Sequence, residues 1–154
     1  MAGTMNKLEK YRVNPKNFSL KQFTPDDRSA RSGDKAEDLA ELARLTQAIN
    51  LRHDILHAQG KHKVLLILQG MDTSGKDGTI NHVFSACDPF GIRLACFKAP
   101  NEKELSHDYL WRVHAVVPAK GELVIFNRSH YEDVLIVKVH DWISEEECER
   151  RYRQ

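Results

Sequence analysis

The residues from Lys63 to Thr79 constrain the fold of this chain more than any other stretch. The apolar run Val64–Leu68 has the length and branching of a strand buried on both faces. The spacing Gly-x-x-x-x-Gly-Lys follows, from Gly70 to Lys76, and apolar residues then recur at helical intervals. A loop with this spacing, placed between a strand and a helix, is typical of a phosphate-binding P-loop (Walker A motif).

The expected chemistry of this loop follows from its backbone. Gly70 and Gly75 allow positive φ angles, which lets the backbone close on a ligand. Successive N–H groups and the N-terminus of the next helix then attract an anion, and Lys76 adds a mobile full charge. The predicted phosphate-binding residues of the stretch are Gly70, Met71, Thr73, Ser74, Gly75, Lys76, Asp77, Gly78 and Thr79.

The residue after the lysine departs from the usual motif. A Ser or Thr hydroxyl normally binds magnesium at this place, whereas this chain has Asp77. Magnesium prefers oxygen ligands, usually one or two carboxylates together with water molecules. We therefore predict that Asp72, inside the loop, is the carboxylate that takes over as the ligand of Mg²⁺.

Strands and helices are expected to alternate along the rest of the chain. Capping-box pairs predict two helix starts, at Asp34 with Glu37 and at Asn101 with Glu104. The expected helices cover residues 34–59, 76–87, 101 to about 116, 134 to about 140 and 144 onward, and the expected strands cover 64–68, 92–97 and 123–126. This alternation predicts a parallel α/β sheet in a core of residues 34–154, preceded by an extended basic arm of residues 1–33.

Polar residues follow each of the three expected strands. The loop follows the first, Lys98 the second and the cluster from Asn127 to Asp133 the third. Ligands of such sheets bind beyond the carboxyl ends of the strands, so these residues predict one phosphoryl-transfer site. Its expected catalytic residues are Asp72, Lys76 and Arg128.

The third cluster has two interpretations. Arg128 can offer a two-pronged guanidinium to phosphate oxygens, and Lys98, Arg128 and Glu132 complete the predicted phosphate- and nucleotide-binding residues. Asn127 stands where a second metal-binding Asp is expected, and its amide oxygen can bind magnesium with Glu132 or Asp133 as nearby carboxylates. The alternative is that Arg128 and Glu132 form an ordinary surface ion pair.

Composition adds limits of a general kind. With 41% hydrophobic and 29% charged residues, the chain is typical of a soluble globular protein, and no apolar run reaches membrane-spanning length. The three cysteines show no paired spacing, which suits the reducing cytoplasm, and Cys87 and Cys96 are expected to pack as small hydrophobes. His53 is expected in the core, and Trp111 is expected to pack, with base stacking as the alternative. Residues 1–33 carry seven Lys or Arg against three acidic residues, and with their aromatics they suggest self-association into a homo-oligomer.

Three segments resemble the polyphosphate kinase 2 family: Gln69–Ile80, Leu105–Arg112 and Phe126–Leu135. The resemblance implies a thymidylate-kinase-like, P-loop kinase-like three-layer α/β/α sandwich and a magnesium-dependent exchange of phosphate between inorganic polyphosphate and nucleotides. It also implies that Asp72 is catalytic and binds metal, and that Lys76 contacts the transferred phosphate. Glu132 resembles the class III branch, whose members phosphorylate both AMP and ADP.

Family members of this kind continue beyond the equivalent of Gln154, with a helical lid and two further strands. We therefore expect the chain to be the N-terminal portion of such an enzyme, with the C-terminal strands and lid missing. Alone, such a chain is expected to bind phosphate weakly and to catalyse poorly, because lid closure is missing. Polyphosphate and adenine nucleotides are the expected partners, and neither a nucleic acid nor a membrane is expected. The alternatives are an ATP-dependent nucleoside monophosphate kinase and a non-catalytic phosphate-binding module.

Overall fold

The computed structural model describes residues 9–29, 31 and 33–154. The chain divides into two compact units, Met1–Arg44 and Leu45–Gln154, and helix α2 (Lys35–Gln59) runs through the division. The arm and core boundary predicted after residue 33 remains a prediction.

The first unit contains three short 3-10 helices, η1 (Glu9–Tyr11), η2 (Pro15–Asn17) and η3 (Leu20–Gln22). Phe18 and Phe23 flank the last of these in extended conformation, and their ring centroids lie 5.7 Å apart. The predicted capping box of helix α2 is confirmed. Asp34 Oδ1 accepts from the Glu37 N–H at 2.9 Å, and Glu37 Oε2 accepts from the Asp34 N–H at 3.3 Å. The docking of the arm on the core stays a prediction.

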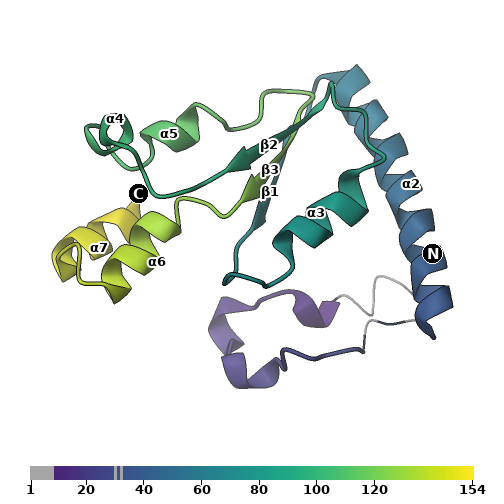
Figure 1. Cartoon of the computed structure of the whole chain (residues 1–154), viewed down its shortest axis with the longest axis horizontal. Coiled ribbons are helices and arrows are strands. Elements are labelled where there is room, and N and C mark those ends of the chain that lie inside the picture. The colour runs from purple at the N-terminus through teal and green to yellow at the C-terminus, as the bar shows by residue number, and fades with distance from the viewer. Residues whose placement is uncertain (1–8, 30, 32) are drawn as a thin grey trace. The chain divides into compact units, whose positions relative to one another are not determined.

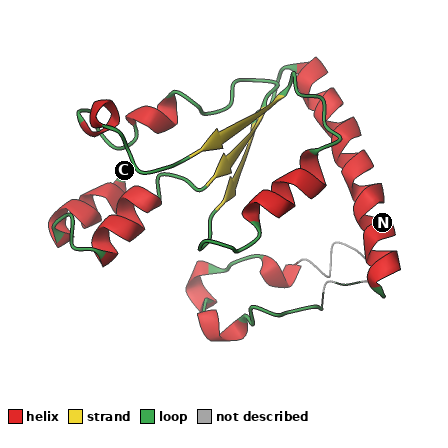
Figure 2. Ribbon diagram, viewed as in Figure 1, coloured by secondary structure: helices red, strands yellow, loops and turns green. Residues whose placement is uncertain are grey.

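The second unit is built on a three-stranded parallel sheet, which confirms the predicted α/β class (Figures 1 and 2). Strands β1 (Val64–Leu68), β2 (Ile92–Cys96) and β3 (Leu123–Asn127) lie in the order β1-β3-β2. The register pairs both Leu68 and Cys96 with Asn127, so all three strands end at the same level. The residues that directly follow the three strands therefore lie at the same edge of the sheet.

Strand β1 is not buried on both faces as its apolar run predicted. Within the described residues it pairs only with β3, and Val64 and Leu65 are 42% and 40% exposed. The central place belongs to β3, whose residues 123–126 are all buried. An apolar run thus identified a strand correctly but could not identify its place in the sheet.

Helices cover the sheet on two sides (Figure 1). On one side, α5 (Trp111–His114) contributes Val113 to a buried cluster with Phe97, Val124 and Phe126. On the other side, α3 (Lys76–Phe84) faces the side chain of Ile125, which lines a small cavity together with residues of α3 and β2. The alternation of β3 residues between the two sides accounts for the layered arrangement.

The single helix predicted from residue 101 to about 116 is wrong. Two short helices stand there, α4 (Glu102–Leu105) and α5, although the predicted capping box at Asn101 and Glu104 is confirmed. Between them, Ser106 Oγ donates to the Lys103 carbonyl at 2.8 Å, and Asp108 Oδ1 accepts from the Leu110 N–H at 3.0 Å. These side chains compete for backbone groups that a continuous helix would use.

The chain closes with α6 (Glu132–Val139) and α7 (Glu145–Arg153), which pack on each other. Ser144 caps α7 as expected, since its hydroxyl accepts from the Glu147 N–H at 3.2 Å. Cys87 is buried as predicted, but Cys96 is exposed, because it ends β2 at the open edge. Among the described helices, none combines the length and hydrophobicity needed to cross a bilayer.

Candidate active site

The loop between β1 and α3 obtains its curvature from two left-handed residues. Gly75 has a φ of +86° and caps α3, as predicted, but the second left-handed residue is Thr73 at +62° rather than Gly70. The conformational freedom of Gly70 is therefore not used for a positive φ. A Cβ atom on Gly70 would lie 2.8 Å from Ser74 Oγ, so a larger residue here would require the serine hydroxyl to move.

Lys76 folds back over this loop. Its ammonium donates to the Gly70 carbonyl at 2.9 Å, to the Met71 carbonyl at 2.7 Å and to Ser74 Oγ at 3.2 Å. These contacts hold a full positive charge beside the backbone N–H groups that begin α3. The loop is thus shaped for an anion.

A hollow of about 310 Å³ opens in front of the lysine. It is lined by Asp72, Thr73, Ser74, Gly75, Lys76, Asp77, Gly78, Asn127 and Arg128. Of the predicted binding residues in the loop stretch, three lie outside this lining: Gly70 and Met71 contribute carbonyl groups to Lys76, and Thr79 Oγ1 donates to the Gly75 carbonyl at 3.0 Å. The structure thereby joins the loop after β1 to the first residues after β3.

Arg128 connects the loop with α6. Its φ is +63°, and its N–H donates to the Leu68 carbonyl at 3.0 Å, which ties it to the end of β1. Its guanidinium donates through Nη2 to Asp72 Oδ1 and through Nη1 to Glu132 Oε1, the latter at 3.1 Å. The side chain of Asp72 is 87% exposed and that of Arg128 only 29%. The arginine is therefore largely enclosed by the protein, whereas its partner in the loop faces solvent.

Two residues that we did not predict complete this network. Gln69 Nε2 donates to Glu132 Oε1 at 2.6 Å, and the hydroxyl of the fully buried Ser129 donates to Gln69 Oε1 at 3.1 Å. One signal was available in the sequence, because Gln69 is the first polar residue beyond the apolar run of β1.

Asp77 and Asn127 form a second contact across the hollow. Asn127 Nδ2 donates to Asp77 Oδ1 at 2.6 Å, so the acidic residue at the usual Ser or Thr position is held by an amide from β3. This contact uses the NH₂ group of Asn127, a residue that lines the hollow together with Asp72. The described residues include no group of three His, Cys, Asp or Glu arranged to hold a metal by themselves.

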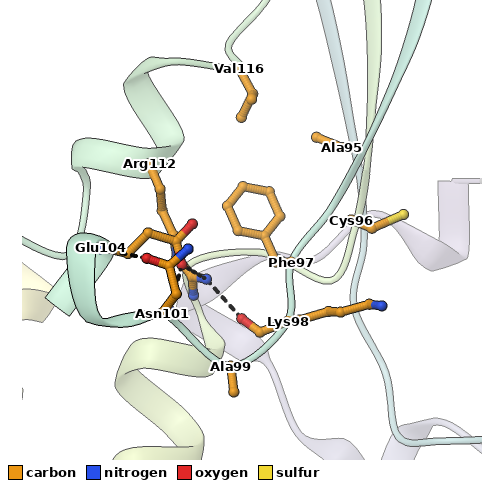
Figure 3. Close-up of a pocket in the computed structure, with 9 residues that line it drawn as sticks. All are labelled: Ala95, Cys96, Phe97, Lys98, Ala99, Asn101, Glu104, Arg112 and Val116. Atoms are coloured by element: carbon orange, nitrogen blue, oxygen red, sulfur yellow. Dashed lines mark hydrogen bonds and ion pairs between the residues drawn. The ribbon is translucent and has the colours of Figure 1, made fainter.

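Lys98 lies outside the hollow. It lines a neighbouring cavity of about 220 Å³ that Arg128 and Glu132 also line, so these three predicted residues meet on the far side of the arginine. The carbonyl of Lys98 accepts from Arg112 Nη1 at 2.7 Å, and Figure 3 shows the lysine side chain running away from that contact.

Arg112 lines this cavity and also the pocket drawn in Figure 3. Its Nη2 donates to Asp133 Oδ2 at 2.7 Å, both side chains are 9% exposed, and its guanidinium lies 5.3 Å from the Phe97 ring centroid. Asp133, considered as a carboxylate near the metal, is therefore engaged elsewhere. The partners are 21 residues apart in sequence, and no spacing rule points to such a pair.

His130 lies between these two networks on the turn after β3. Burial lowers the pKa of its imidazole, and the nearby carboxylate of Asp133 acts in the opposite direction. Its Nδ1 is buried and has no hydrogen-bond partner within the described part of the chain. A neutral imidazole suits this place better than a charged one.

Comparison with known proteins agrees with this geometry. Residues 32–154 match the family described as Polyphosphate kinase 2 (PPK2). The chain is 53% identical over 147 residues to an AMP/ADP-polyphosphate phosphotransferase of Meiothermus ruber, covering 95% of this chain and 55% of that protein. An ADP-polyphosphate phosphotransferase of Rhodopseudomonas palustris is 50% identical over 94 residues, which is 61% of this chain and 32% of that protein.

The fold is also similar to that of a solved structure of this family. The crystal structure of polyphosphate kinase 2 from Arthrobacter aurescens TC1 superposes with a TM-score of 0.89 at 44% identity, covering 96% of this chain and 53% of that one. The chain thus spans about half the length of the relatives that it matches over nearly all of its own length. The match in family, sequence and structure confirms the resemblance drawn from the three motifs, and the chain belongs to the polyphosphate kinase 2 family.

Proposed function

We propose that this chain carries the phosphate loop of a phosphotransferase that moves a phosphoryl group between inorganic polyphosphate and AMP or ADP. The observation that carries the proposal is the hollow where Lys76, the N-terminus of α3 and the guanidinium of Arg128 face the same space. The names of the relatives from Meiothermus and Rhodopseudomonas supply the substrate class.

Phosphoryl transfer needs positioned phosphates and fixed positive charge more than it needs covalent chemistry. The terminal phosphate of the polyphosphate would accept hydrogen bonds from the loop amides and from Lys76. Arg128 would stabilise the charge that develops on the transferred group. The acceptor phosphate would approach from the side of the cavity that Lys98 and Glu132 line.

The residues of the hollow fit a magnesium ion. Asp72 offers an exposed carboxylate and Asn127 an amide oxygen from the same lining, and Mg²⁺ usually keeps several waters beside one or two protein ligands. Asp72 and Asn127 would therefore hold the ion. When bound, Mg²⁺ would neutralise charge on the phosphate oxygens.

The remaining expectations belong with this proposal. A phosphotransferase that uses adenine nucleotides would work in the cytoplasm, where three unpaired thiols are stable. Self-association through the basic arm also remains a proposal.

The test is phosphorus NMR of AMP mixed with polyphosphate, magnesium and the protein. We expect ADP to form, and we expect Asp72→Asn and Lys76→Ala each to abolish its formation. Asp26→Asn and Lys120→Ala make the same chemical changes at exposed positions outside the loop and should have no effect. Product from ATP plus AMP, with none from polyphosphate, would instead show an ATP-dependent nucleoside monophosphate kinase. A mixture that stays unreacted would contradict the proposal for this chain.

A further inference from the structure

We infer that Gln69 is a positioning residue, which fixes the carboxylate of Glu132 and, through it, the guanidinium of Arg128 at the mouth of the phosphate hollow. The hydrogen-bond network carries this inference. Only its consequence for phosphate binding rests on the proposed function.

The orientation of the Gln69 amide is dictated by its neighbours. The Ser129 hydroxyl accepts from the Tyr131 N–H at 3.2 Å, which leaves its own proton to donate to Gln69 Oε1 at 3.1 Å. Ser129 is fully buried and cannot exchange this partner for water. Glu132 Oε1 accepts from Arg128 Nη1, and beside this acceptor the NH₂ group of Gln69, rather than its oxygen, has to face Glu132.

The two donors meet on one atom. Glu132 Oε1 accepts from Gln69 Nε2 at 2.6 Å and from Arg128 Nη1 at 3.1 Å. Since a single oxygen accepts both, the carboxylate cannot rotate without breaking two hydrogen bonds. Gln69 directly follows β1 and Glu132 begins α6, so the contact also connects these two elements.

The consequence appears at the opposite end of the arginine. With Nη1 fixed on Glu132, the guanidinium presents Nη2 toward the loop, where it meets Asp72. Without the amide of Gln69, Glu132 and Arg128 would turn together, and the charge in front of the loop would lose its fixed place. Fixed donors stabilise an anion better than mobile ones, because no ordering remains to be done on binding.

Gln69→Glu makes this inference testable through pH. The change places two carboxylates where an amide and a carboxylate are 2.6 Å apart, so the second of the pair ionises only at a raised pH. At alkaline pH they repel each other, and as the pH falls one proton joins them. The exchange of both residues, Gln69→Glu with Glu132→Gln, restores one amide and one carboxylate and again lets residue 132 accept from Arg128.

The experiment measures tripolyphosphate binding by calorimetry between pH 5.5 and 8.5 and compares each variant with the wild type at every pH. We expect Gln69→Glu to weaken binding by roughly tenfold at pH 8.5. The deficit should shrink as the pH falls, and the exchanged double variant should recover most of the affinity. Gln47→Glu, the same change at an exposed position of α2, should match the wild type. An equal loss at every pH, or a double variant no better than the single one, would overturn the inference.

A second measurement does not depend on phosphate binding. Carbon NMR of the side-chain carboxyl groups should show, in Gln69→Glu alone, a carboxyl pair with one pKa raised well above the ordinary value of glutamate. This titration should be absent from the wild type, from Gln47→Glu and from the double variant. If it appears while no form binds tripolyphosphate, the Gln69 contact stands and the proposed function fails. If it is missing, the positioning role is wrong.

Gln69→Asn covers the case in which Gln69→Glu does not fold. The shorter amide stays neutral but no longer reaches Glu132 from its place beside Ser129. We expect a loss of tripolyphosphate affinity that is constant with pH. Unchanged affinity in this variant would contradict a positioning role for Gln69.

Discussion

Two arginine–aspartate pairs lie at the same edge of the sheet and differ in exposure. Arg112 and Asp133 are each 9% exposed, and the guanidinium also reaches the Lys98 carbonyl and the Phe97 ring. Arg128 is 29% exposed and its partner Asp72 is 87% exposed, in a loop that lines a hollow. The first pair is enclosed by the fold, whereas the second is open to a ligand.

The difference shows that the same two residue types, paired in two places, can serve two purposes. Removing one partner of an enclosed pair leaves an uncompensated charge, so the pair is required for stability even where its net contribution is small. An exposed pair contributes little to stability, because water competes for both partners. Arg128 can therefore exchange Asp72 for a phosphate oxygen at low cost, and Arg112 cannot make such an exchange.

The largest expected effect concerns the enclosed pair. Arg112→Met should lower the free energy of unfolding by about 3–5 kcal/mol, because the Asp133 carboxylate would remain buried without its partner. Urea unfolding measures this value. Arg44→Met, which removes an exposed helix pair with Glu41, is the matched control and should leave the free energy of unfolding nearly unchanged. Equal losses in the two variants would remove the distinction between enclosed and open pairs.

The next effect concerns the open pair. Arg128→Met should reduce phosphoryl transfer by roughly 10²–10³-fold, the usual cost of losing one donor to a developing charge. Its unfolding free energy should change by less than about 1 kcal/mol, since the pair with Asp72 is mostly exposed. Initial rates by phosphorus NMR and urea unfolding give the two values. A stability loss as large as that of Arg112→Met would show that the open pair also serves the fold.

A pair of glycines separates backbone strain from ligand binding. Gly75 and Gly60 both have positive φ angles, +86° and +58°, and a Cβ atom on either would meet nothing within 4 Å. Gly75→Ala and Gly60→Ala should therefore each cost about 1–2 kcal/mol of unfolding free energy. Only Gly75→Ala should also weaken tripolyphosphate binding in calorimetry. Equal binding by both variants would argue that the loop is not the phosphate site.

The smallest effect is a pH dependence at His130, which lies on the turn between the two pairs. Burial lowers the pKa of this imidazole below its ordinary value of 6.5, so the folded protein binds the proton less readily than the unfolded chain. Its contribution to stability is present above pH 6.5 and is lost as the pH falls through the lowered value. His130→Gln should therefore lose less stability than the wild type between pH 6.5 and 5 in urea unfolding. Parallel curves for the two proteins would contradict this account.

Local sequence rules accounted for most of the fold. Capping residues, glycines and apolar runs act over a few neighbouring positions, and they located the strands, the loop and both capping boxes. They failed at residues 106–110, where Ser106 and Asp108 interrupt a helix through bonds to the backbone. They also failed for β1, because an apolar run does not tell a central strand from one at the edge.

The sequence predicted the loop of the candidate site but not the residues that hold the site in place. The spacing of Gly70, Gly75 and Lys76 identified the loop, and the residues after β3 indicated the facing cluster. Arg112 lies within a segment for which the sequence predicts a helix. Its contact with Asp133 depends on how this segment and the one after β3 fold together. The left-handed backbone of Thr73 also escaped prediction, since residue type favours this conformation only for glycine and a few polar residues.

The left-handed φ of Arg128 has a consequence for how this protein can change. A non-glycine residue costs about 1–2 kcal/mol in that conformation, so Arg128→Gly would relax the turn while deleting the charge. The glycine variant would then be the more stable protein and the arginine protein the active one, which is a trade-off between stability and activity. Selection for thermal stability alone would favour glycine at position 128. The arginine there therefore indicates a requirement other than stability.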